Sequence, residues 1–405
     1  MSTDSYDILI VGGGMVGSTL ACALAQQQPD LSIAILEAKQ QAPVFTASHY
    51  HHRVSAIALS SQRIFQTLGV WEAIQQQRIS PFTHIEVWDA QGKGEINFGA
   101  EEIAETHLGH IIENNVMQAA LMEKCKSYTQ IKWIAPIELT DWREEEESIV
   151  LFSRDQRSFK AKLAVAADGA NSWLRTQSGF ICDKKEYQQQ ALVVEVQTAL
   201  PHQQRARQVF LETGPLAFLP LASENRCSIV WSLPHAHAEQ MLNLAEQPFK
   251  QALTDAFSKR LGDIEKIEQR YTFTLYQQQA KQYVHSRKVL VGDAAHIIHP
   301  LAGQGLNMGL LDAVCLAEIL KEARQKKGDL ASLSHLRRYE RWRKADNLTM
   351  LTCVDGIKKL FASENKSIQQ LRSCGLTFLN QIEWVKNQFT SYAIGNREGL
   401  PKMAQ

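Results

Sequence analysis

Apolar positions at the start of the chain follow strand spacing and then helix spacing. The run Asp7–Val11 is apolar after its first residue, and the pattern from Gly14 to about Gln28 is helical. A second apolar run, Leu31–Leu36, is rich in β-branched residues and predicts another strand. The chain therefore opens as strand, glycine turn, helix and strand.

Helices and longer strands are both predicted in the rest of the chain. The tail after Ser332 has the pattern of an amphipathic helix, and a helix also follows Gly305. Further helices are predicted over 55–78, 113–126 and 239–261, and strands over 85–98, 131–159, 163–167, 191–197, 207–220, 226–233 and 288–291. No long Gly-, Ser- or Pro-rich linker divides the chain, so we expect its domains to interleave.

Composition narrows the function classes. The 405 residues are 44% hydrophobic and 21% charged, which permits a large core and suggests two domains or one domain with insertions. Lys+Arg and Asp+Glu both number 43, so the formal net charge is zero and nucleic acid is not an expected partner. The seven cysteines are widely spaced without a C-x-x-C, which predicts small buried side chains rather than a disulfide framework or zinc ribbon.

The first glycine motif lies between the opening strand and helix. Gly12–Gly17 reads G-x-G-x-x-G, in which Gly12 permits a tight turn, Gly14 lets a pyrophosphate approach and Gly17 permits close helix packing. Glu37 ends the second strand, where a carboxylate binds ribose hydroxyls and repels a 2′-phosphate. The motif predicts FAD or NAD rather than NADP.

A second glycine-rich segment, Gly292–Asn307, follows the predicted strand 288–291 and leads into a helix. Asp293 is placed to accept hydrogen bonds from ribityl hydroxyls, and Gly303 and Gly305 let backbone N–H groups approach a ligand. The start of the helix adds a positive dipole end. A second dinucleotide-binding segment so far along the chain favours FAD over NAD.

Further residues have both a functional and a structural interpretation. Asp168–Arg175 reads D-G-x-x-S-x-x-R after a strand. Asp168 and Arg175 are candidates to order the pyrophosphate loops or contact a nicotinamide cofactor, but an N-cap with a salt bridge is an equal alternative. His296 and His299 are candidate acids or bases, and turn-fixing hydrogen bonds are the favoured alternative for both.

These motifs, in this order, resemble the flavoprotein aromatic hydroxylases of the para-hydroxybenzoate hydroxylase type. The segment His299–Asp312 (HPLAGQGLNMGLLD) is similar to the signature of the ubiquinone-biosynthesis hydroxylases. Within them the chain looks most like the VisC-type 2-polyprenylphenol hydroxylases. The other segments that carry the resemblance are Arg53–Ile57, Leu68–Trp71, His107–Val116, Ala206–Phe210, Ala217–Leu221 and Cys227–Leu233.

The resemblance implies an α/β fold with a Rossmann-like FAD-binding domain interleaved with an antiparallel-sheet substrate domain, plus C-terminal helices. The FAD-binding domain is expected to comprise residues 1–80, 100–185 and 285–330, the substrate domain 81–99 and 186–284, and the C-terminal helical region 331–405.

The resemblance also implies where FAD lies. The adenosine end is expected at Gly12, Gly14, Gly17 and Glu37, and Arg53 near the pyrophosphate, with a surface ion pair as its alternative role. Ribityl and isoalloxazine are expected at Asp293, Pro300, Gly303, Gln304, Gly305, Leu306 and Asn307. The apolar segment Leu216–Leu221 suits a prenylated phenol, although ordinary sheet core is the expectation for most of its side chains. No catalytic residue is identified, and no metal is expected at His49, His51 and His52, which lack a suitably spaced carboxylate or thiolate.

The implied activity is that of an FAD-dependent aromatic monooxygenase in ubiquinone biosynthesis. Reduced FAD and O2 are expected to form a C4a-hydroperoxide that hydroxylates a polyprenylphenol ortho to its hydroxyl group. The chain has no second G-x-G-x-x-G, so the reductant is a transient NAD(P)H or a redox protein. Another ring-hydroxylation step and a non-catalytic flavin-bound scaffold remain alternatives.

Its surroundings are also predicted. No basic segment precedes Asp7–Val11 and no apolar run reaches ~20 residues, so we expect a cytoplasmic protein, at most peripheral to the inner membrane. Other ubiquinone-biosynthesis proteins are candidate partners. The basic stretch Arg337, Arg338, Arg341, Arg343 and Lys344 is expected to be a solvated helix face, with anionic lipid or a partner protein as the alternative.

Overall fold

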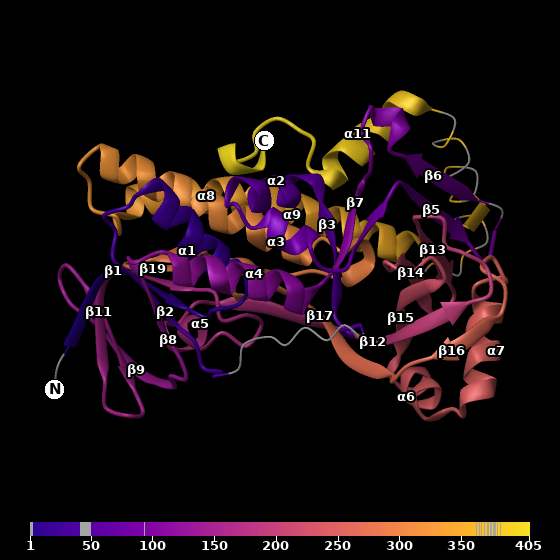
Figure 1. The fold of residues 1–405 in the computed structure, drawn as a ribbon, viewed down its shortest axis with the longest axis horizontal. Helices are drawn as coiled ribbons and strands as arrows, with labels where there is room; N and C mark the ends of the chain where they lie inside the picture. Colours follow the sequence, from indigo (N-terminus) through magenta and orange to yellow (C-terminus); the bar gives the residue numbers. More distant parts are fainter. Residues whose placement is uncertain are drawn as a thin grey trace.

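The computed structural model describes residues 3–40, 50–92, 94–361 and 382–405, and also residues 363, 365, 367, 369, 370, 372, 375, 378 and 380. Figure 1 shows one sheet around β1 and β11 at one end of the view and a second around β13–β15 at the other. Helices α8 (Gly305–Gln325) and α9 (Leu333–Phe361) run along one side between them. The mixed α/β class predicted from the sequence is confirmed.

The first sheet is built around the opening strand. Its order is β18-β19-β11-β1-β2-β8, with β10 and β9 added through β11, and β1 is parallel to both neighbours. The strand β2 is buried along its whole length, and β1 and β11 are buried over their last four residues, as expected for a parallel sheet covered on both faces. The strands are β1 (Thr3–Val11), β2 (Ile33–Leu36), β8 (Ile131–Ile134), β9 (Leu139–Glu144), β10 (Ile149–Ser153), β11 (Ser158–Ala166), β18 (Val284–His285) and β19 (Lys288–Leu290).

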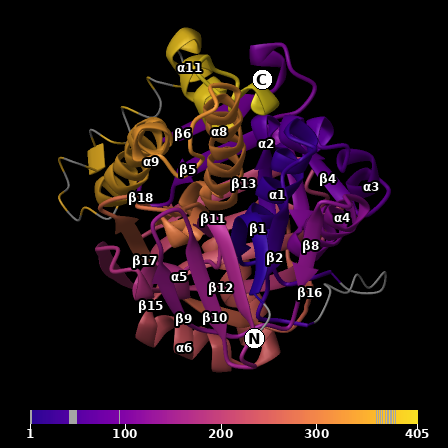
Figure 2. The ribbon, with the colours of Figure 1, turned by 90° about the vertical axis from the view of Figure 1, so that its left-hand side faces the viewer.

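Helices cover this sheet and bring distant segments together. The helix α1 (Met15–Gln27) packs against both α4 (Asn114–Ser127) and α8. Figure 2, viewed from the end that carries the N-terminus, shows α8 and α1 side by side above β1 and β11. The helix after the first glycine motif therefore contacts the helix after the second.

The second sheet is mostly antiparallel. Its order is β20-β17-β12-β15-β14-β13-β5-β6, with β16 added through β12, and α6 (His235–Asn243) and α7 (Glu246–Ala256) pack against it. The strands are β5 (His84–Asp89), β6 (Glu95–Gly99), β12 (Cys182–Thr198), β13 (Arg205–Leu211), β14 (Gly214–Pro220), β15 (Arg226–Pro234), β16 (Ile264–Ile267), β17 (Tyr271–Ala280) and β20 (His296–Ile297). Because β20 lies in the second glycine-rich segment, that segment starts from one sheet and pairs with the other.

A small third sheet corrects one expectation. The helix predicted over 55–78 is wrong at its start, because Val54–Ala58 forms β3 and pairs with β7 (Gly109–Glu113), which also pairs with β4 (Ile79–Phe82). Helix begins only at α2 (Leu59–Thr67), so strand pairing overrides the local helical pattern. The remaining elements are α3 (Trp71–Gln75), α5 (Trp173–Gln177), α11 (Glu383–Ile394), η1 (Glu101–Ile103), η2 (Gly292–Ala294), η3 (Pro300–Ala302) and η4 (Lys402–Ala404).

The structure also bears on the burial of the cysteines and on membrane-spanning helices. The prediction of buried cysteines is wrong for Cys353, which is exposed on α9, and Cys182 is only partly buried, while Cys374 lies outside the described residues. In the described part of the chain no helix combines the length and apolarity needed to cross a bilayer. The expected domain boundaries stay a prediction.

Candidate functional site

The three glycines of the first motif differ in how closely other atoms surround them. Gly12 has φ +102°, and a Cβ there would lie 2.5 Å from the carbonyl oxygen of Ala167. A Cβ on Gly17 would lie 2.1 Å from the carbonyl oxygen of Gly12. A Cβ on Gly14 would meet no atom of a described residue within 4 Å. Two glycines therefore allow the chain to pack, whereas Gly14 leaves room at the N-terminus of α1.

Glu37 follows β2 and lies beside this turn. Its Oε2 accepts a hydrogen bond from the backbone N–H of Gly13 at 2.7 Å, and its Oε1 accepts from that of Lys39 at 2.9 Å. The side chain is only half-buried, so its carboxylate keeps access to a ligand. This placement fits the ribose-binding role expected for the residue.

Asp293 lies in η2, directly after β19. Its carboxylate is accessible to solvent, yet protein atoms surround it on most sides, and this desolvation raises its pKa. Electrostatic interactions with His296 and Arg53 oppose this increase in the pKa of Asp293. The carboxylate forms no hydrogen bond with any residue that the structure describes. An acceptor of this kind is available to hydroxyl groups of a ligand.

Arg53 lies just before β3 and is exposed. The expected alternative, a surface ion pair, is not formed with any residue of the described ranges. Its charge instead acts on the carboxyl group of Asp293. The charge of Arg53 thus lowers the pKa of a carboxyl group from a distant segment, and neither group is paired with a described residue.

In the loop from Pro300 to Asn307 the glycines expose backbone, while the Gln304 side chain donates to Ala393 O at 3.2 Å. Gly303 has φ +60°, and a Cβ on Gly305 would meet no atom within 4 Å. The Asn307 side chain, in contrast, is buried and its amide is engaged by protein. It accepts from Ala58 N at 3.0 Å and Ser61 Oγ at 2.7 Å, and donates to Ala56 O at 2.9 Å and Gly303 O at 3.2 Å.

Asp168 and Arg175 have separate roles. The N-cap of α5 is Ser172, whose Oγ accepts from Arg175 N at 3.0 Å, while the Asp168 carboxylate accepts from Trp173 N at 2.7 Å and burial raises its pKa. An N-cap is therefore confirmed in this segment, but the salt bridge expected with it is wrong. Arg175 instead donates to the carbonyl oxygens of Ala294, at 3.1 Å, and Ala170, at 2.8 Å. It thereby ties this turn to η2.

The three motifs meet through close backbone packing. The atoms nearest a Cβ on Gly12 belong to Ala167 and Asp168. Those nearest a Cβ on Gly292 or Gly309 include the side chain of Val16, at 3.2 Å and 2.8 Å respectively. No described side chain caps α1 or α8, so both helices present N–H groups at their positive ends. These features fit a dinucleotide cofactor that spans the motifs.

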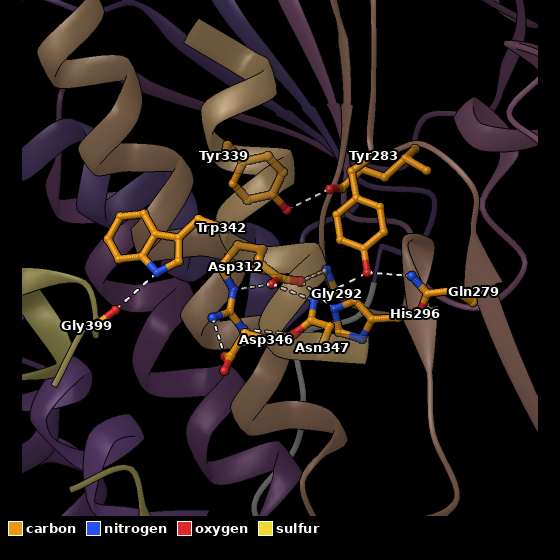
Figure 3. A network of polar contacts seen from close by, with 12 residues as sticks. Gln279, Tyr283, Gly292, His296, Asp312, Tyr339, Trp342, Asp346, Asn347 and Gly399 are labelled. Atoms are coloured by element: carbon orange, nitrogen blue, oxygen red, sulfur yellow. Dashed lines mark hydrogen bonds and ion pairs between the residues drawn. The ribbon is translucent and has the colours of Figure 1, made fainter. Parts of the chain in front are cut away.

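A buried polar network lies behind η2 (Figure 3). His296 Nε2 lies 2.5 Å from Asp312 Oδ2, which confirms the turn-fixing interpretation of His296. Arg343 Nε donates to Asp312 Oδ1 at 2.7 Å, and both side chains are buried. The expectation of a solvated basic face is therefore wrong for Arg343. The sequence signal that was missed is a charged residue, Asp312, on the otherwise apolar face of α8, where a buried charge needs a partner.

His299 does not fix the turn by hydrogen bonding. The side chain is fully buried, and neither ring nitrogen bonds to a described residue. Burial lowers its pKa to about 3, so the ring is neutral, and it packs edge-on against Tyr187 with ring centres 5.0 Å apart. Its role as an acid or base stays a prediction.

Metal binding finds no support in the described ranges, which contain no group of three or more potential ligands. The rings of His51 and His52 lie 4.3 Å apart, and His52 stacks on Tyr271. His49 lies outside the described residues.

Several known proteins are similar to the chain over nearly its whole length. A family model described as an FAD-binding domain matches residues 5–350. The 3-demethoxyubiquinol 3-hydroxylase of Escherichia coli strain K12 is 33% identical, with 98% of this chain and 100% of that protein covered. The ubiquinone hydroxylase UbiL of Rhodospirillum rubrum is 33% identical, with 96% and 89% covered. The mitochondrial ubiquinone biosynthesis monooxygenase COQ6 of Danio rerio is 31% identical, with the same coverage of 96% and 89%.

A solved structure agrees on the fold. The p-nitrophenol 4-monooxygenase PnpA of Pseudomonas putida DLL-E4 matches with a TM-score of 0.77, covering 98% of this chain and 100% of its own. At 16% identity this likeness is evidence for the fold alone. The narrower resemblance to the VisC-type branch is not tested by these relatives and stays a prediction.

Proposed function

Because this chain belongs to the FAD-dependent monooxygenase family of ubiquinone biosynthesis, we propose that it hydroxylates the aromatic ring of a polyprenylated phenol in that pathway. Its cofactor is FAD and its reaction class is monooxygenation. The observation that carries the proposal is that the three motifs pack together at Gly12 and Gly292, where the Asp293 carboxylate and the Arg53 guanidinium are unpaired with any described residue.

The residues proposed to hold FAD divide by the part of the cofactor they suit. The N-terminus of α1 at Gly14 suits the pyrophosphate, with Arg53 as a counter-charge, and Glu37 suits the adenosine ribose. Asp293 would accept hydrogen bonds from ribityl hydroxyls. The backbone at Gly305 would lie next to the isoalloxazine, where the positive end of α8 favours negative charge.

When bound, FAD supplies the reaction with O2, while the protein orients the phenol and excludes water. The residues of β14 alternate between two faces. Leu216 and Phe218 are buried in a core that α7 completes, so they are structural. Ala217 and Leu219 are only partly buried, and we propose that substrate contacts come from this face.

Two ring positions are compatible with the family. The carbon ortho to the phenol oxygen follows from the resemblance to the 2-polyprenylphenol hydroxylases. The full-length similarity to a 3-demethoxyubiquinol 3-hydroxylase favours a different hydroxylation step as the second candidate. Regiochemistry of the product separates the two.

The reductant, partners and location complete the proposal. NAD(P)H binding transiently, or a redox protein, would deliver electrons, and other ubiquinone-biosynthesis proteins are candidate partners. A peripheral contact with the inner membrane would give access to a prenylated substrate. Anaerobic mixing of the holoprotein with NADH or NADPH tests the first option, since an unchanged flavin spectrum would leave only a protein donor.

The decisive experiment is product analysis. Holoprotein, ¹⁸O2, a reductant and a prenylphenol or its demethoxyubiquinol counterpart should yield one ring hydroxyl group that carries the label, located by mass spectrometry and NMR. FAD-bound protein that gives no labelled product with either substrate and any donor would support the scaffold alternative instead.

A further inference from the structure

Arg343 is the central cation of the network behind η2. Its Nε donates to Asp312 Oδ1 at 2.7 Å, and its two terminal nitrogens donate to Asp346 Oδ2 at 2.7 Å and Asn347 Oδ1 at 2.9 Å. The side chain is 1% exposed. These three acceptors lie on α8 and α9, so the guanidinium is held in a fixed position between the two helices.

Asp312 connects this cation to the cofactor turn. Its Oδ2 accepts from the backbone N–H of Gly292 at 3.0 Å and lies 2.5 Å from His296 Nε2. Its Oδ1 accepts from Asn347 at 3.2 Å as well as from Arg343. Four donors fill the acceptor sites of a carboxylate. Two of these donors, Gly292 and His296, lie on either side of Asp293 in the chain. Asp312 therefore fixes the position of the turn that carries Asp293.

The same face of α9 contacts the strands that lead into the turn (Figure 3). Tyr339 donates its hydroxyl hydrogen to the carbonyl oxygen of Leu290 at 2.8 Å, and Asn347 Nδ2 lies 3.4 Å from the hydroxyl of Tyr283. Tyr339, Arg343 and Asn347 are spaced by four residues and therefore share one side of the helix. Helix α9 thus contacts both the strand before η2 and the Asp312 carboxylate that holds η2.

We propose that Arg343 is a positioning residue for FAD. It keeps Asp312 charged and directed at Gly292, so that the turn presents the Asp293 carboxylate to the cofactor. Without the guanidinium, the buried carboxylate would keep only His296 as a counter-charge, and the turn would lose its fixed acceptor. The inference rests on the proposed placement of FAD at Asp293. It makes α9, which lies outside the glycine motifs, part of the cofactor site.

A purely structural role makes a different prediction. A buried arginine that only stabilises the fold would lower the unfolding temperature of the apoprotein without a specific effect on FAD. A matched control is Arg207 of β13, which is 7% exposed and donates from Nε to Glu86 Oε2 at 2.7 Å in the second sheet. Arg343→Met and Arg207→Met each remove a buried guanidinium that is paired with a buried carboxylate.

The test compares FAD affinity in these two full-length variants. Apoprotein is titrated with FAD and followed by flavin fluorescence, and the unfolding temperature of each apoprotein is measured in parallel. Arg343→Met should raise the Kd for FAD by about tenfold or more, whereas Arg207→Met should change it by less than about twofold at a similar loss of unfolding temperature. Equal changes in Kd for the two variants would overturn the proposal.

A milder variant keeps the proposal testable if Arg343→Met does not fold. Arg343→Lys retains the charge but loses the planar guanidinium with its several donors. We therefore expect the Kd for FAD to rise by about threefold and the flavin midpoint potential to shift measurably. Asp293→Asn serves as the reference for the cofactor placement and should weaken FAD binding. If Asp293→Asn weakens binding and Arg343→Lys changes neither Kd nor potential, the positioning role is wrong. If Asp293→Asn itself has no effect, the proposed placement of FAD fails, and the positioning role fails with it.

Discussion

The carboxylate of Glu37 accepts a hydrogen bond from the backbone N–H of Gly13 at 2.7 Å. The residue that is expected to bind ribose therefore also holds the turn that is expected to bind pyrophosphate. The two halves of the first motif are coupled, although they are separated by the whole of α1.

We predict that Glu37→Gln weakens FAD binding without unfolding the protein. A neutral amide replaces the charged acceptor of the ribose hydroxyl groups, which reduces the binding free energy by about 1–2 kcal/mol, or raises Kd about tenfold. Fluorescence titration of the apoprotein with FAD measures the change. Glu123→Gln, at an exposed ion pair on α4, is the control and should leave the Kd unchanged. An unaltered Kd in Glu37→Gln would place the ribose elsewhere.

Gly12 and Gly14 should respond differently to the same substitution. In Gly12→Ala the new methyl group meets the carbonyl oxygen of Ala167 at 2.5 Å with φ at +102°, so we expect a loss of about 2–4 kcal/mol in unfolding free energy. In Gly14→Ala the backbone, at φ −66°, accepts alanine, and the methyl group meets no atom within 4 Å in the part of the chain that the structure describes. Stability should stay within about 0.5 kcal/mol while FAD affinity falls.

Urea unfolding of both apoproteins, followed by FAD titration of Gly14→Ala, checks this pair. Gly14→Ala that binds FAD as tightly as the unmodified protein would show that the cofactor does not approach this backbone. A stable Gly12→Ala would show that the turn can relax away from Ala167.

The glycine motifs were predictable because their requirements are local. A positive φ at Gly12 and the position of Glu37 at the end of a strand follow from a few neighbouring residues. The link between Arg343 and Asp312 was not predictable in this way, because it depends on how α8 and α9 pack. The strand Val54–Ala58 was missed for the same reason, since its pairing partner is β7.

Asn307 was predicted to lie at the flavin, but its side chain binds other parts of the protein. Its amide forms four hydrogen bonds to the segment around β3 and α2 and to the loop before α8. We predict that Asn307→Ala lowers the unfolding free energy by about 2–4 kcal/mol, because buried backbone groups lose their partners. Urea unfolding measures it. Asn243→Ala, an exposed site on α6, should cost less than about 0.5 kcal/mol, and a similarly small loss at Asn307 would contradict the structural role.

His299 makes stability depend on pH. Its pKa is lowered to about 3 in the folded protein because the ring is buried, whereas an unfolded histidine titrates near 6.5. The unfolded state therefore binds a proton first, and stability is lost as the pH falls from about 6.5 toward about 3. Between pH 7.5 and pH 5 this residue alone should cost about 2 kcal/mol. His110, whose pKa burial also lowers to about 3, should add a similar loss.

Replacement of the ring tests this assignment. His299→Leu removes the titrating group, so its unfolding free energy should fall by about 2 kcal/mol less than that of the unmodified protein between pH 7.5 and pH 5. His110→Leu should give a second reduction of the same sign, and the double variant should combine both. Urea unfolding at the two pH values supplies the comparison, with each variant referred to its own stability at pH 7.5. If His299→Leu keeps the full pH dependence, His299 is protonated in the folded protein over this range and its ring has found a partner.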